Sequence, residues 1–84
     1  MIQNNHYKTS DTALASYLIT KSYPLLSIDY TLVRFEFIFP MSDEIKEMAS
    51  KYIIGKALTD PSVFNKVNKK LLRIVRQQIQ WGDD

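Results

Sequence analysis

Five cationic side chains near the C-terminus are the residues of this sequence best suited to do chemistry with a partner. They share a stretch, residues 61–82, that contains no acidic residue: Lys66, Lys69, Lys70, Arg73 and Arg76. Spacings of three and four residues place them on one side of a helix, where they could neutralise phosphates of DNA or RNA. The alternative is the ordinary solvated face of an amphipathic helix.

The positive charge of the chain comes from this stretch alone. The net charge is +2 at pH 7. Residues 1–42 carry no net charge and residues 43–60 carry −1, whereas residues 61–82 carry +5. Charge runs on amphipathic helices are usually solvated faces. Surface helices usually intersperse both signs, however, so the absence of acids supports a nucleic-acid contact.

Side chains that catalysis needs are few. The chain has no cysteine, and its single histidine, His6, lies in a polar N-terminal segment. Such a segment holds a general base poorly, and Ser-His-Asp and Cys-His arrangements are excluded. The acids Asp43, Glu44 and Glu47 could hold a metal, but acids in a first helical turn more often complement the helix dipole. We therefore expect a protein that is not an enzyme and that binds neither a metal nor a cofactor.

Trp81 lies at the end of the basic stretch and is the candidate for a protein interface. Tryptophan is enriched at interfaces, yet it could equally close one end of the core. A protein partner is therefore the alternative to nucleic acid. On that reading the chain is an interaction module, an inhibitor or accessory subunit that binds a larger host or viral protein.

The helices that position these residues follow from caps and periodicity. Asp60-Pro61 predicts the start of the basic helix, because aspartate suits the N-cap and proline the first helical position. Ser42 predicts the N-cap of a preceding helix that ends near Gly55. A first helix is predicted over residues 11–21.

Two strands are predicted between the first and second helices. Residues 25–31 and 33–39 alternate with period two, and the second run places four residues on one face: Val33, Phe35, Phe37 and Phe39. We expect an antiparallel hairpin packed on the helices, with this face in the core. The predicted fold is α+β in the order α-β-β-α-α. It forms one domain over residues 7–81, with flexible ends at 1–6 and 82–84.

The edges of a two-stranded sheet need partners, because their unpaired N–H and C=O groups are a liability. Residues 6–9 could add a short third strand in cis. The edge could instead pair with a second copy, and the sequence favours a homodimer. No apolar run approaches the ~18 residues of a membrane span, and no signal peptide is evident, so we expect a cytoplasmic protein.

Four short motifs spread along the chain occur together in one known type of domain. They are Thr9-x-Asp11-x-x-Leu14-Ala15-x-Tyr17-Leu18, Phe35-x-Phe37, Asp60-Pro61-x-x-Phe64 and Leu71-Leu72-Arg73. Over about residues 7–76 the chain resembles a small domain family of unknown function from phages, mobile elements and little-studied bacteria and archaea. That family often has glycine after the first helix, where this chain has Ser22. The resemblance implies the fold and a mobile-element origin, and it assigns no site residue.

These observations predict a small non-enzymatic binding protein, phage- or mobile-element-like. The basic face of its C-terminal helix would contact the phosphates of DNA or RNA.

Overall fold

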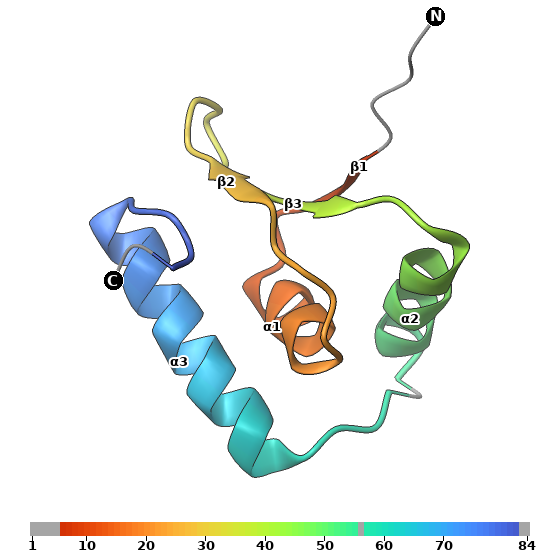
Figure 1. The fold of residues 1–84 in the computed structure, drawn as a ribbon. Helices are drawn as coiled ribbons and strands as arrows, with labels where there is room; N and C mark the ends of the chain where they lie inside the picture. The colour runs from red at the N-terminus through yellow and green to blue at the C-terminus, as the bar shows by residue number, and fades with distance from the viewer. Residues whose placement is uncertain (1–5, 56, 83–84) are drawn as a thin grey trace, which may run out of the picture.

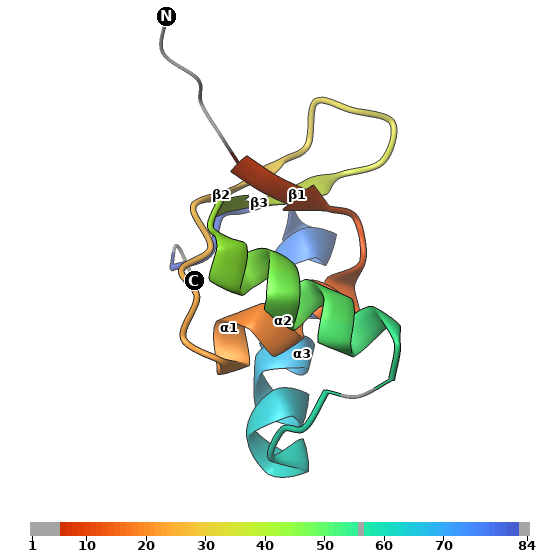
Figure 2. The same ribbon diagram turned by 90° about the vertical axis from the view of Figure 1, so that its right-hand side faces the viewer.

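The computed structural model describes residues 6–55 and 57–82, and these residues form three helices and a three-stranded antiparallel sheet. The elements in chain order are β1 (His6–Thr9), α1 (Thr12–Thr20), β2 (Ser27–Asp29), β3 (Glu36–Pro40), α2 (Asp43–Ile53) and α3 (Pro61–Gln77). The helices cover one face of the sheet, and α1 lies between α2 and α3 (Figures 1 and 2). The predicted α+β class is confirmed.

The sheet has the order β1-β3-β2, so β3 is its central strand. The predicted third strand is present. It pairs in cis with β3, where Tyr7 lies opposite Phe39. His6 is already paired with Pro40, one residue before the predicted start of the domain at residue 7. The other predicted flexible ends, residues 1–5 and 83–84, lie outside the described residues, and Gly82 is exposed.

The core forms where alternate strand residues meet the helices. Phe37 and Phe39 of β3 are fully buried, as the alternation predicts. The remaining buried apolar side chains come from β2 and all three helices: Leu14, Ala15, Tyr17, Leu18, Ile28, Ile45, Ala49, Leu71 and Ile74. Phe35 is half-buried and packs edge-on against Phe37, with ring centroids 5.3 Å apart.

The prediction that Val33 belongs to the buried strand face is wrong. Val33 is fully exposed, in the connection over residues 30–35 that joins β2 to β3. The carboxylate of Asp29 accepts hydrogen bonds from the backbone N–H of Thr31 (2.9 Å) and from its hydroxyl (2.6 Å). These bonds, which also lower the pKa of Asp29, turn the chain out of the sheet after β2. The strands are therefore shorter than their alternation suggests.

Side-chain caps set the helix starts. Asp11 accepts from the N–H of Ala13 at the start of α1, and Ser42 accepts from Ile45 at the start of α2. Asp60 accepts from Ser62 ahead of α3. The predicted N-caps of α2 and α3 are thus confirmed, and the cap of α3 determines where the basic helix begins.

Candidate nucleic-acid interface

One side of α3 is buried and the other carries the cations. Leu71 and Ile74 are fully buried, and Phe64 packs against the same core. The predicted cations lie on the remaining surface, and we call this surface the basic face: Lys66, Lys69, Arg73 and Arg76 are exposed and Lys70 is half-buried. The structure therefore brings all five predicted cations together on one helix.

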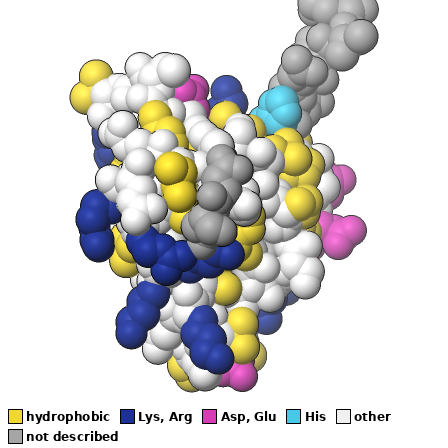
Figure 3. All heavy atoms as spheres, turned by 60° about the vertical axis from the view of Figure 1, so that its left-hand side comes forward, with side chains coloured by type: hydrophobic (Ala, Val, Ile, Leu, Met, Phe, Trp, Pro, Cys, Tyr) yellow, Lys and Arg dark blue, Asp and Glu magenta, His cyan; other side chains and the backbone are white. Residues whose placement is uncertain are grey.

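Over the residues that the structure describes, the charged side chains of the basic face are all cationic. In Figure 3 the dark-blue Lys and Arg side chains gather across one region of the surface, and the magenta acids lie toward its periphery. Among the described residues, no acidic side chain lies within ion-pair distance of Lys66, Lys69 or Arg76. Grouped charges of one sign raise the local potential and attract anions.

A buried polar contact fixes α3 against α1. Ser16 of α1 is fully buried, and its hydroxyl donates to Oδ1 of Asn68, 2.9 Å away; the carbonyl oxygen of Thr12 lies at the same distance. A hydroxyl in the core needs a partner, so this contact favours one rotation of α3 about its axis. That rotation turns the basic face outward.

The chain reverses immediately after α3. Gln78 adopts a left-handed conformation (φ 56°), and the N–H of Ile79 donates to the carbonyl oxygen of Ile74 (3.2 Å). This is a Schellman arrangement with glutamine where glycine is usual, and Ile79 packs on the core beside Ile74. The reversal sends residues 79–82 back along the helix.

Two side chains tie this returning segment to β2 and the connection that follows it. The hydroxyl of Tyr30 donates to the carbonyl oxygen of Ile79 (2.6 Å), and burial raises the pKa of Tyr30. The amide of Gln80 bonds both backbone groups of Ile28: it accepts from the N–H (2.7 Å) and donates to the carbonyl oxygen (2.9 Å). Sequence reasoning missed both residues, because no local pattern shows that a side chain will bond a backbone some fifty residues away.

Trp81 is held beside the basic face by this segment. Its ring packs partly on the core, and Nζ of Lys70 lies 4.5 Å from the ring centroid. That geometry is a cation–π contact. Trp81 therefore closes part of the core, one of its two predicted roles, while its role as a protein interface stays a prediction.

Features of other kinds of functional site are few over residues 6–55 and 57–82. No group of three or more His, Asp or Glu side chains in this part of the chain could hold a metal ion, and its surface has no pocket. Asp43 and Glu44 lie in the first turn of α2, as expected for acids that complement a helix dipole. None of the described helices has the length and apolar character needed to cross a membrane.

Comparison with known proteins finds no matching family model, no matching curated protein and no matching solved structure. The resemblance to a mobile-element domain family therefore stays a prediction.

Proposed function

We propose that this protein binds nucleic acid through its basic face, as a small non-enzymatic binding protein. The observation that carries the proposal is the concentration of five cations, four of them exposed, on one side of α3, in a segment without acids. From Lys66 to Arg76 the face extends about 15 Å along the helix axis. That length suits several successive phosphates of one strand.

The composition of the face favours phosphate over carboxylate partners. Arg73 and Arg76 offer planar donor groups that bind phosphate oxygens in pairs, and the lysines add point charges. Polynucleotides present phosphates at regular short spacing, so a row of cations on a rigid helix meets several at once. A cytoplasmic location and a phage-like or mobile-element origin agree with this function and are part of the proposal.

Binding to labelled DNA and RNA oligonucleotides, followed by fluorescence anisotropy, tests the proposal. The test variant is Lys69→Gln, Arg73→Gln, Arg76→Gln. The matched control, Arg34→Gln, Lys46→Gln, Lys51→Gln, removes the same charge from other exposed positions. We expect the test variant to lose most of the affinity and the control to retain it. Equal affinities for the two variants would contradict the proposal.

A protein–protein interaction module is the second candidate. Three exposed apolar side chains follow one another closely along the chain where α2 ends and the connection to α3 begins: Ile53, Ile54 and Leu58. Large apolar side chains exposed close together are typical of interaction surfaces. An inhibitor or accessory subunit that binds a larger host or viral protein would use this surface. Its binding would depend little on salt.

A further inference from the structure

We propose that the preferred ligand of the basic face is single-stranded nucleic acid, and that Trp81 stacks on one of its bases. This inference rests on the proposed function and adds the ligand class. It comes from the position of one aromatic ring at the border of a cationic surface.

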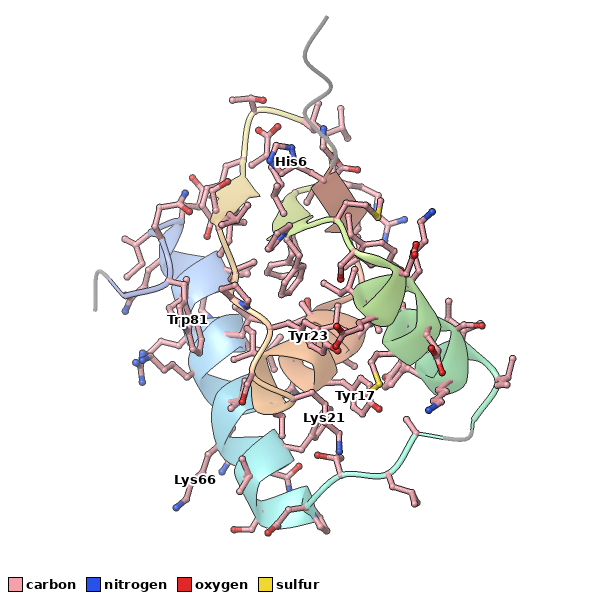
Figure 4. The ribbon with its side chains drawn as sticks, turned by 45° about the vertical axis from the view of Figure 1, so that its right-hand side comes forward. His6, Tyr17, Lys21, Tyr23, Lys66 and Trp81 are labelled. Carbon is pink, nitrogen blue, oxygen red and sulfur yellow. The ribbon has the colours of Figure 1, made fainter. Side chains whose placement is uncertain are left out.

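The ring is held in place before any ligand arrives. Two residues that precede Trp81 are tied to the body of the protein. The amide of Gln80 is bonded twice to the backbone of Ile28, and the carbonyl oxygen of Ile79 accepts from the hydroxyl of Tyr30. Figure 4 shows Trp81 lying against the side of α3, with Lys66 farther along the same helix and pointing away from the body of the protein. A positioned ring loses little conformational freedom on binding, which favours affinity.

A lysine ammonium lies over the ring. The ammonium of Lys70 lies over the indole at 4.5 Å, and Trp81 is only partly buried. The lysine stem can rotate, so a base can take the place of the ammonium on the ring. The displaced ammonium then lies next to the phosphate of the same nucleotide. The contact between Lys70 and Trp81 thus pairs one stacking position with one phosphate position.

A stacking position selects single strands over duplexes. Bases in a duplex are stacked on each other, whereas unpaired bases can stack on aromatic side chains while cations follow the backbone. The sugar plays no part in this contact, so single-stranded DNA and RNA share the required chemistry. Separate oligonucleotides distinguish these two sources.

Anisotropy with oligothymidylate and oligouridylate of about 12 nucleotides, and with a duplex of the same length, tests the inference. The proteins are wild type, Trp81→Phe and Trp81→Leu, each checked for folding by circular dichroism. We expect wild type to bind at least one single strand more tightly than the duplex. Trp81→Leu should weaken that binding about tenfold without changing duplex binding, and Trp81→Phe should retain most of it.

The intrinsic fluorescence of wild type gives a second measurement that needs no variant, because Trp81 is the sole tryptophan of the sequence. Stacking predicts strong quenching as the single strand saturates the protein. Equal binding of duplex and single strand, with no change in Trp81→Leu or no quenching, would overturn the inference and leave the proposed function standing. Absence of binding to every oligonucleotide would overturn both.

Discussion

The side-chain amide of Gln80 forms a pair of hydrogen bonds with the backbone of Ile28. The N–H of Ile28 donates to Oε1 at 2.7 Å, and Nε2 donates to the carbonyl oxygen of Ile28 at 2.9 Å. A primary amide here takes the place that the peptide group of a further strand would occupy. Gln80 therefore covers the open edge of β2 and joins the C-terminal segment to the sheet.

Replacing Gln80 by alanine should destabilise the fold. The change removes both hydrogen bonds and leaves two part-buried backbone groups of Ile28 without that partner, a loss of about 1–2 kcal/mol. Urea denaturation measures the change in free energy of unfolding. Gln77→Ala is the matched control, because Gln77 is exposed in the last turn of α3. Equal stability of the two variants would show that the Gln80 amide contributes nothing.

The oligomeric state follows from the edges of the sheet. The sequence favours a homodimer because a two-stranded sheet leaves two open edges, but β1 fills one edge in cis and Gln80 covers part of the other. The outer strand β1 is short and carries exposed Lys8, which discourages edge pairing. We expect light scattering to give a mass near 9.8 kDa over a dilution series. A mass twice as large would support the homodimer.

Two residues of the same alternating pattern should differ in how much their substitution by alanine lowers the stability of the fold. Phe37 is fully buried and Val33 is fully exposed. Phe37→Ala should cost about 3–5 kcal/mol, a large share of the stability of so small a domain, and leave the protein mostly unfolded. Val33→Ala should leave the thermal midpoint unchanged. A cooperative melt of Phe37→Ala near the wild-type midpoint would contradict this core.

Ser22 occupies a position that favours glycine. Its φ is 72°, and the N–H of Tyr23 donates to the carbonyl oxygen of Leu18 (3.0 Å), which closes α1 as Gln78 and Ile79 close α3. Left-handed backbone is costly for serine, so Ser22→Gly should stabilise the fold by about 0.5–1 kcal/mol and raise Tm by roughly 4 °C.

Ser50→Gly is the control for this change, because Ser50 is exposed within α2, where glycine lowers stability. Calorimetry should thus show shifts of opposite sign for one chemical substitution. A lower Tm for Ser22→Gly would mean that the left-handed conformation costs the serine little.

Helix starts, the buried part of the phenylalanine row and the side of α3 that faces solvent could all be predicted from the sequence. Each depends on interactions within a few residues, such as the cap at Asp60 or the spacing of Lys66, Lys69 and Arg73. The residues at which the strands begin and end could not be predicted from the alternation. Alternation continues through Val33 although the Asp29 carboxylate has already turned the chain at Thr31.

The contacts of the candidate site that could not be predicted join residues far apart in the sequence. The contacts of Gln80 with Ile28, Tyr30 with Ile79 and Ser16 with Asn68 join residues about fifty positions apart. Nothing in the local sequence distinguishes these polar residues from solvent-exposed ones. The contact of Lys70 with Trp81 likewise depends on the reversal at Gln78, a residue that rarely adopts such backbone.

The salt dependence of binding tests whether the basic face contacts polynucleotide phosphates. Each phosphate contact releases counterions, so the logarithm of the association constant should fall linearly with the logarithm of salt concentration. Contacts from all five cations predict a slope of about −3.5 for a single strand, and Lys69→Gln, Arg73→Gln, Arg76→Gln should reduce it by about 2. A slope near zero in wild type, or the same slope in wild type and this variant, would contradict phosphate binding by the basic face.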